Sequence, residues 1–253
     1  MIVMKFGGSS VADAERIRYM SEIVKARLDR KPVLVVSALG DTTDHLLEAG
    51  DAALKRGVVS LEQIEKLHIK TIEDLELDDA ALKDVRSLMT EMQILLMGIS
   101  LIREMTGRTK DYLVSFGERL SVRIIAAHFE KQGIKAEALD AWDTGFITDS
   151  NFTSAELSDE SWEMIPSKLL PLVDEGVLPV ITGFIAKDEK GNITTLGRGG
   201  SDLTATLIGA ACRADEIQVW KDVDGILTAD PRVVRNARPV ETITYEAASE
   251  LAY

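Results

Sequence analysis

The chain has 253 residues, of which 45% are hydrophobic and 28% are charged, and its formal net charge is −13. This length and composition fit one large globular domain, or two small ones, with a sizeable core. The negative charge argues against nucleic-acid binding, because phosphate backbones are bound by clustered lysine and arginine, and the sequence has no basic stripe.

Cysteine and histidine are scarce. The single cysteine, Cys212, excludes an intramolecular disulfide and a zinc site of several thiolates, which favours a reducing compartment. With only three histidines, a histidine-rich metal site is not expected. Gly7 and Gly8 break the apolar start too soon for a signal peptide or a membrane span, so we expect a cytoplasmic protein that does not act at a membrane.

The first forty residues show a strand, loop and helix order that repeats. Residues 2–6 predict a short buried strand, and residues 13–28 carry apolar side chains at the spacing of one helix face. A second apolar strand is predicted at 33–36, and another helix begins near Thr43.

A long helical stretch follows. Residues 44–107 are charged, helix-periodic and poor in helix breakers, which predicts a helical insertion between strands of the same domain. Beyond it we expect a strand at 112–114, a helix at 120–129 that begins just after Glu118, and a strand at 136–139. Residues 142–157 are turn-rich and irregular.

The last part of the chain alternates strands and helices again. We expect a buried strand at 177–185, a turn at 188–192 with a hairpin return at 193–196, a helix through Ala211 and a strand at 217–220. A helical pattern closes the sequence at 245–253. This alternation predicts an α/β fold with a mostly parallel sheet.

The loop from Lys5 to Ser10 follows the first strand and combines a cation with two glycines and two serines. Its free backbone N–H groups suit a phosphate, and its glycines let the phosphate approach the backbone. From these residues alone, a phosphate cradle and a plain strand-to-helix turn with a solvated lysine are equally good interpretations.

Two further features are structural when each is taken alone. The loop 37–43 is mainly hydroxyls and backbone, which predicts that Thr42 or Thr43 caps the next helix. Glu118, placed at a helix start, would complement the helix dipole.

The segment Gly197–Asp202 is the most informative. Arg198 between glycines can grip a carboxylate or phosphate through two parallel hydrogen bonds, and Asp202 can receive an ammonium or organise a lysine. A purely structural turn needs no arginine there, so function is favoured. In 221–232 the aspartates lack EF-hand spacing, and a nucleotide-binding loop with Lys221 and Arg232 near phosphates fits better.

Four motifs in register resemble the catalytic domain of the aspartate kinase family, in the amino acid kinase superfamily. They are KFGGSSV at 5–11, SFGERLS at 115–121, TLGRGGSD at 195–202 and WKDVDGILTADPRVV at 220–234. The resemblance spans nearly the whole chain. It implies the amino acid kinase fold, a three-layer αβα sandwich with a mostly parallel open sheet and a helical insertion.

The resemblance also implies a reaction, the transfer of the γ-phosphoryl group of ATP to the side-chain carboxylate of L-aspartate. This step begins the synthesis of lysine, threonine and methionine. A carboxylate with a pKa of about 4 is ionised at neutral pH and needs no general base. The protein's task is then alignment and cationic stabilisation of the transition state.

Residue roles carry over from the family to the matching positions. Lys5 would stabilise the transferring phosphoryl group, and Asp202 would orient Lys5 or the substrate ammonium. L-aspartate would be held by Thr43, Glu118, Arg198 and Ser201, with Arg198 on a carboxylate and Glu118 near the α-ammonium. ATP would be contacted by Lys5, Gly7, Gly8, Ser9, Lys221, Asp222, Leu227 and Arg232. Mg²⁺ would bridge the phosphates mainly through water and phosphate oxygens, with no protein metal ligand.

Two departures from the family pattern stand out. Leu227 occupies a position where several relatives carry tyrosine, which implies a more aliphatic adenine pocket. Family members continue past the final helix with FGAK and with regulatory ACT domains, which the sequence lacks. We therefore expect weakened ATP affinity, no feedback by lysine or threonine, and a homodimer weakened by the absence of ACT domains.

Two alternatives remain. One is another member of the superfamily, a glutamate, acetylglutamate or uridylate kinase; the SFGERLS stretch and the helical insertion favour aspartate. The other is a non-catalytic module that binds a nucleotide or an amino acid, for which turnover with Mg-ATP, abolished in Lys5→Ala, is the discriminating observation.

Overall fold

The computed structural model describes residues 1–223, 225–230 and 232–252. The chain divides into two compact units, Met1–Trp220 and Lys221–Tyr253. Each unit is described by itself.

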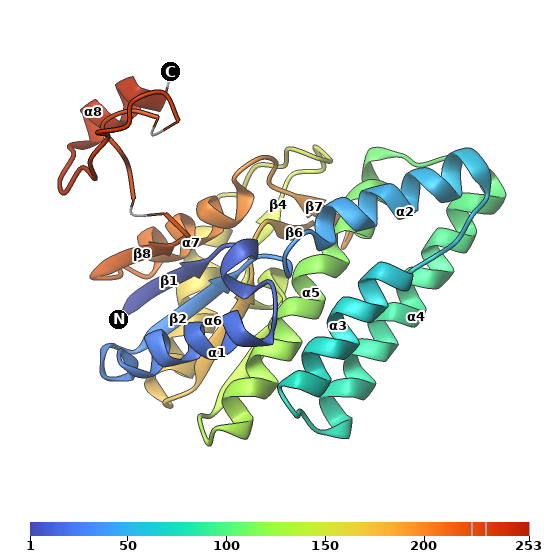
Figure 1. The fold of residues 1–253 in the computed structure, drawn as a ribbon, viewed down its shortest axis with the longest axis horizontal. Helices are drawn as coiled ribbons and strands as arrows, with labels where there is room; N and C mark the ends of the chain where they lie inside the picture. The colour runs from blue at the N-terminus through green and yellow to red at the C-terminus, as the bar shows by residue number, and fades with distance from the viewer. Residues whose placement is uncertain (224, 231, 253) are drawn as a thin grey trace. The chain divides into compact units, whose positions relative to one another are not determined.

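A five-stranded sheet forms the centre of the first unit (Figure 1). Its order is β3-β5-β2-β1-β8, and every neighbouring pair is parallel. The strands are β1 (Ile2–Phe6), β2 (Pro32–Val36), β3 (Ala136–Leu139), β5 (Leu178–Thr182) and β8 (Glu216–Trp220). The predicted parallel sheet is confirmed, and β1 and β3 have the predicted bounds.

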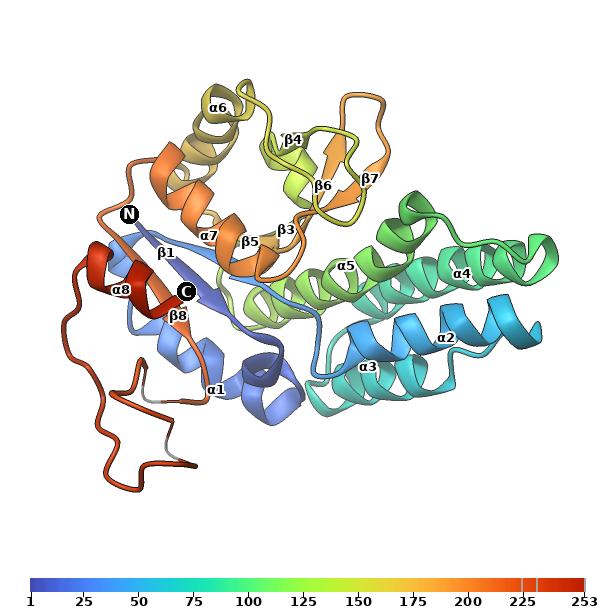
Figure 2. The ribbon, with the colours of Figure 1, turned by 90° about the horizontal axis from the view of Figure 1, so that it is seen from above.

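Helices cover both faces of this sheet, which makes three layers (Figure 2). Helices α1 (Ala14–Lys25) and α5 (Gly107–Lys131) lie on one face, and α6 (Ser161–Asp174) and α7 (Gly200–Ala211) lie on the other. Successive residues of a strand point to opposite faces of the sheet: Met4 packs against the layer of α1 and α5, and Val3 packs against the layer of α6 and α7. The predicted α/β sandwich is therefore confirmed.

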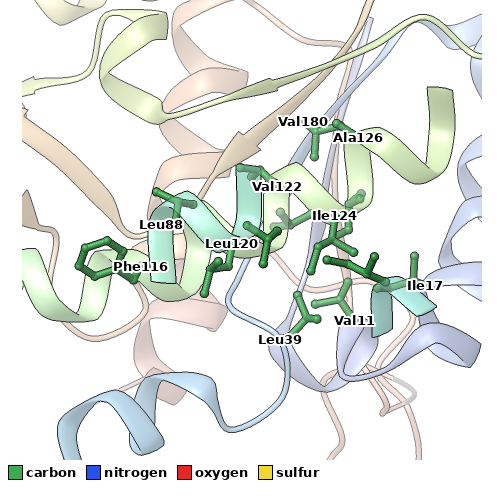
Figure 3. Packing of buried hydrophobic residues seen from close by; sticks show 14 of the residues in the cluster. Val11, Ile17, Leu39, Leu88, Phe116, Leu120, Val122, Ile124, Ala126 and Val180 are labelled. Atoms are coloured by element: carbon green, nitrogen blue, oxygen red, sulfur yellow. The ribbon is translucent and has the colours of Figure 1, made fainter. Parts of the chain in front are cut away.

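The helical stretch after β2 forms three antiparallel helices beside α5. They are α2 (Thr42–Arg56), α3 (Glu62–Asp74) and α4 (Asp79–Ile102). Their buried faces join one continuous apolar cluster with α5 and the sheet, in which Phe116, Leu120 and Ile124 of α5 lie near Leu39 and Leu88 (Figure 3). The predicted helices exist, and the helical chain runs on through α5 to Lys131.

Helix α4 is long and apolar enough to cross a membrane by length and composition alone, with 33% of its most apolar window buried. This is weak evidence, because core helices of soluble proteins have the same length and composition. In the structure α4 packs its buried face against α2, α3 and α5.

A second, small sheet contains β4 (Ile147–Thr148), β6 (Ile185–Asp188) and β7 (Ile193–Thr195). β6 and β7 form the predicted hairpin. The single strand predicted at 177–185 is wrong at its end, because the chain leaves the central sheet after Thr182. Phe184 has a φ of 69°, a left-handed conformation that breaks a strand, so β6 begins in a different sheet.

The strand predicted at 112–114 is wrong, since these residues lie inside α5. A short run of tyrosine, leucine and valine has strand propensity, but Leu113, Phe116 and Leu120 form one helix face buried in the core. Glu118 is consequently in the middle of a long helix, and the interpretation that it complements a helix start is wrong.

Helix α6 has no counterpart among the elements predicted from the sequence. It contains two prolines, Pro166 and Pro171, which lack a backbone N–H for the helical ladder. The helix is stabilised instead by packing, because Ile165, Leu169 and Val173 are buried against the sheet.

The second unit has local pairing of its own. Leu227 forms an antiparallel bridge with Pro239, and Val240 donates a backbone hydrogen bond to the Ile226 carbonyl. Helix α8 (Tyr245–Ala252) confirms the predicted final helix, except that Tyr253 lies outside the described residues.

Candidate active site

A cavity of about 350 Å³ lies where three neighbouring parallel strands, β1, β2 and β5, end. Ligand sites of open α/β sheets gather at this edge. The cavity is lined by Lys5, Gly8, Ser37, Ala38, Gly40, Thr43, Glu118, Phe184, Gly197, Arg198, Gly199, Gly200, Ser201 and Asp202. Lys5 and Arg198, which lie far apart in the sequence, line this same cavity.

Lys5 enters the cavity from β1, a central strand. It stands in register with Val35 of β2 and Val219 of β8, and its residue is only 6% exposed. Its Nζ lies 2.6 Å from Oδ1 of Asp202 in the first turn of α7. A nearly buried ammonium is therefore held in a fixed position beside a carboxylate that is partly open to solvent.

The loop after Lys5 packs closely against the loop after β2 at Gly8. A Cβ on Gly8 would lie 3.0 Å from the Ala38 carbonyl oxygen and 3.1 Å from that of Gly40, and one on Gly7 would lie 3.7 Å from the Lys5 Nζ. The chain then forms a short 3-10 helix, Gly8–Val11. Gly8 lines the cavity, whereas Gly7 and Ser9 fall outside the described residues that line it. A phosphate group could therefore reach both the backbone N–H groups of this loop and the Lys5 ammonium.

Glu118 reaches the cavity from the middle of α5. A Cβ on Gly117 would lie 2.7 Å from Cβ of Ala38, so the glycine lets the helix approach the loop after β2. Oε1 of Glu118 accepts a hydrogen bond of 3.2 Å from the Ala38 N–H, and Oε2 is buried with no hydrogen-bond partner among the described residues.

Burial raises the pKa of the Glu118 carboxyl to about 8, although the hydrogen bond from Ala38 opposes this. The group is therefore mainly protonated at neutral pH when the cavity is empty. A cation placed at Oε2 would favour the ionised form, so Glu118 has the chemistry of an ammonium receptor.

Arg198 lies between two glycines with left-handed backbone, Gly197 and Gly199, each with a φ of 76°. An L side chain is strained in that conformation, so glycine is required at both positions. The Arg198 side chain is exposed, and none of the described residues forms an ion pair with it. Its guanidinium is thus free to take up an anion.

The first turn of α7 packs tightly on the chain that follows β5. A Cβ on Gly183 would lie 2.6 Å from Cβ of Ser201, and one on Gly200 would lie 2.8 Å from Cδ2 of Phe184. These contacts place the Ser201 residue and the N-terminal amides of α7 at the wall of the cavity. Gly183 and Phe184 were not among the residues singled out from the sequence, and the available signal was a glycine inside the strand predicted at 177–185.

The hydroxyl loop 37–43 does not cap α2 as predicted. Asp41 occupies the N-cap position without a side-chain cap, and the Thr42 hydroxyl donates to the Leu39 carbonyl. Thr42 is buried, while Thr43 lines the cavity.

The remaining predicted nucleotide contacts, Lys221, Asp222, Leu227 and Arg232, belong to the second unit. Within that unit the Arg232 guanidinium pairs with Asp230 at 2.8 Å. Their roles stay predictions. No group of three or more histidine, cysteine, aspartate or glutamate side chains gathers at metal-binding distance in 1–223, 225–230 and 232–252.

The arrangement places two cations, Lys5 and Arg198, and one buried carboxyl, Glu118, around one small space. Such a site can hold a ligand that carries both carboxylate and ammonium groups and can also stabilise added negative charge near Lys5.

Sequence comparison identifies relatives of the whole chain. The sequence profile described as "Amino acid kinase family" matches residues 1–253. Aspartokinase 1, chloroplastic, of Arabidopsis thaliana is 45% identical over 99% of this chain and 45% of its own length. The aspartokinase of Mycolicibacterium smegmatis is 35% identical over 100% of this chain and 48% of its own length. The chain spans about half the length of these relatives.

A solved structure is also similar. E. coli aspartokinase III in complex with aspartate and ADP, in its R-state, superposes with a TM-score of 0.88 at 31% identity. The match covers 100% of this chain and 56% of that protein.

Proposed function

The chain belongs to the amino acid kinase family, and we propose that it is an aspartate kinase catalytic domain. It would transfer the γ-phosphoryl group of ATP to the side-chain carboxylate of L-aspartate, giving 4-phospho-L-aspartate and ADP. The observation that carries this proposal is the shared cavity of Lys5, Glu118 and Arg198. Its similarity to aspartokinases over 99–100% of the chain supports the choice of acceptor.

L-aspartate fits the charges of the cavity. The Arg198 guanidinium would bind one carboxylate through parallel hydrogen bonds, and Oε2 of Glu118 would receive the α-ammonium. Thr43 and Ser201 would supply hydroxyl partners. The carboxylates of L-aspartate need cations of the protein, and its ammonium needs a carboxylate of the protein. Both kinds of group line the cavity.

The chemical step needs no proton transfer. An oxygen of the ionised aspartate side chain attacks the γ-phosphorus, a new O–P bond forms, and the bond to the bridging oxygen breaks to release ADP. Negative charge on the transferring group is stabilised by the Lys5 ammonium, which Asp202 holds in place at 2.6 Å. Lys5 therefore acts on charge and alignment.

The phosphates of ATP would lie against Gly7, Gly8 and Ser9, whose backbone N–H groups and serine hydroxyl suit phosphate oxygens. Lys221, Asp222, Leu227 and Arg232 would supply further nucleotide contacts. Mg²⁺, held by phosphate oxygens and water, would neutralise phosphate charge. The cytoplasmic location and the homodimer also remain proposals, and the Arabidopsis relative is named chloroplastic.

An acceptor panel tests the proposal. The chain is incubated with Mg-ATP and L-aspartate, L-glutamate, N-acetyl-L-glutamate or uridylate, and ADP release is measured. We expect L-aspartate to give the highest kcat/KM. Preference for another acceptor would identify a different member of the family, and binding of ATP and aspartate without turnover would indicate a non-catalytic module.

A further inference from the structure

A buried carboxylate on α5 joins three separate parts of the chain. Asp111 is 1% exposed. Its Oδ2 accepts hydrogen bonds from the backbone N–H groups of Thr153 at 2.8 Å and Thr195 at 3.0 Å, and its Oδ1 accepts the Thr195 hydroxyl at 3.0 Å. Burial raises the pKa of this carboxyl in spite of these bonds. Burying a charged group is costly unless it is well paired, so these bonds fix the position of Asp111.

The partners of Asp111 are the base of the loop that carries Arg198. Thr195 ends β7 and is three residues from Arg198. The carbonyl of Thr195 accepts the Ala155 N–H at 2.8 Å, and a Cβ on Gly197 would lie 3.4 Å from the Thr153 carbonyl oxygen. The segments around Thr153 and Thr195 therefore pack against each other beneath the loop that carries Arg198, and Asp111 accepts hydrogen bonds from both segments.

The same helix also supplies Glu118. Asp111 and Glu118 are seven residues apart in α5, which places them on one side of the helix, separated by about 10 Å along its axis. Glu118 lines the cavity, and Asp111 binds Thr195 at the start of the loop that carries Arg198.

From this geometry we propose that Asp111 is a positioning residue that fixes the distance between Arg198 and Glu118 across the cavity. Asp111 is not among the residues that line the cavity. By tying the Arg198 loop to α5 it sets the length of zwitterionic acceptor that both groups can bind at once. The kinetic part of this inference rests on the proposed function.

Asp111→Ala removes both acceptor oxygens and leaves the two backbone N–H groups and the Thr195 hydroxyl without them. We expect the KM for L-aspartate to rise about tenfold, equivalent to about 1.4 kcal/mol, while the KM for ATP changes less than about twofold. The preference for L-aspartate over L-glutamate should also fall. Asp111→Asn should restore most of the affinity, because its Oδ1 can accept both N–H groups while its Nδ2 donates to the Thr195 hydroxyl.

Asp188→Ala is the matched control. Asp188 is also buried, at 4% exposed, and lies at the turn of the same β6–β7 hairpin, where its carboxylate accepts hydrogen bonds from the N–H groups of Lys190 and Asn192 and from the Ser150 hydroxyl. None of the described residues of that turn lines the cavity. Its loss should lower stability and leave the KM for L-aspartate unchanged.

A milder pair keeps the test valid if Asp111→Ala does not fold. Thr195→Val deletes the hydroxyl that donates to Asp111. Thr194→Val, at the preceding residue of β7, deletes a buried hydroxyl that lies 2.7 Å from the Thr148 hydroxyl of β4. We expect only Thr195→Val to raise the KM for L-aspartate, by about threefold.

Hydrogen exchange in the ligand-free protein separates this inference from the proposed function. In Asp111→Ala, or in Thr195→Val, amides of 196–201 should exchange faster than in the matched control. If wild type does not phosphorylate aspartate but this difference appears, the proposed function fails and the anchoring role stands. Equal exchange at 196–201 in test and control variants, or an equal rise in the KM for L-aspartate in both, would overturn the positioning role.

Discussion

The edge of the sheet at the cavity and the helices α2–α4 affect the free energy of unfolding in opposite directions. At the cavity, Lys5 and Glu118 are buried and Gly197 and Gly199 adopt left-handed backbone. In the helices, apolar side chains fill the interior, and exposed charges form local pairs such as Lys55–Asp51. The helices therefore add to the free energy of unfolding, while the cavity holds groups that are costly to bury.

Substitutions at the cavity should therefore affect activity, and substitutions in the helices should affect stability. Oε2 of Glu118 is buried and has no hydrogen-bond partner in 1–223, 225–230 and 232–252, which costs free energy until a ligand supplies one. The apolar cluster that runs from α1 through α5 offsets that cost. Substitutions in the two regions should accordingly be separable by measuring kinetics and unfolding on the same variants.

The largest effect is expected at Lys5. Lys5→Ala removes the ammonium beside the transferring phosphoryl group, and kcat should fall about 10²–10³-fold. The free energy of unfolding should change little, since the partner, Asp202, is partly exposed and can be solvated. Lys55→Ala, which removes an exposed lysine of α2, is the control and should leave kcat unchanged. Similar kcat values for the two variants would contradict the role of Lys5.

A core substitution in α4 should give the reverse pattern. Met92 is fully buried, and Met92→Ala should lower the free energy of unfolding by about 2–5 kcal/mol. Chemical denaturation measures this change. The KM values of the folded fraction should stay within about twofold of wild type, because Met92 does not line the cavity. A large shift in KM would show that the two regions are coupled.

Two glycine substitutions sharpen the contrast. Gly8→Ala would place a Cβ 3.0 Å from the Ala38 carbonyl oxygen, so the loop must shift, and kcat/KM for ATP should fall about tenfold. Gly98→Ala in α4 meets nothing within 4 Å and should stabilise the protein by about 0.5–1 kcal/mol through helix propensity. Thermal unfolding and steady-state kinetics of both variants check this. A more active Gly8→Ala, or a destabilised Gly98→Ala, would contradict it.

Most of the regular elements could be predicted because their patterns are local. The apolar runs of β1 and β2 and the periodicity of α1 and α7 need no knowledge of the rest of the chain. The strand predicted at 112–114 was wrong because these residues have strand propensity, but packing of α5 in the core makes them helical. Helix α6 was missed because its prolines weaken the helical signal.

The sequence marked several residues that line the cavity, but it did not show how the fold holds them there. Glycine-rich motifs marked Lys5, Arg198 and Asp202, and the cavity brings them together. The sequence alone could not show that Glu118 comes from mid-helix, or that Gly117 and Gly183 permit close approaches. Such contacts join residues far apart in sequence, so they depend on the tertiary fold.

The charge of Glu118 provides the decisive test of how the cavity binds its acceptor. Its pKa of about 8 means that it is mostly protonated at pH 7 and that an arriving ammonium should displace the proton. The KM for L-aspartate should therefore fall as pH rises from 6 to 8.

Calorimetry of L-aspartate binding at pH 7, in two buffers of different ionisation enthalpy, counts the protons released. We predict release of about one proton by wild type and of none by Glu118→Gln, which cannot ionise. Equal proton release by both proteins at pH 7 would contradict the assignment of Glu118 as the ammonium receptor.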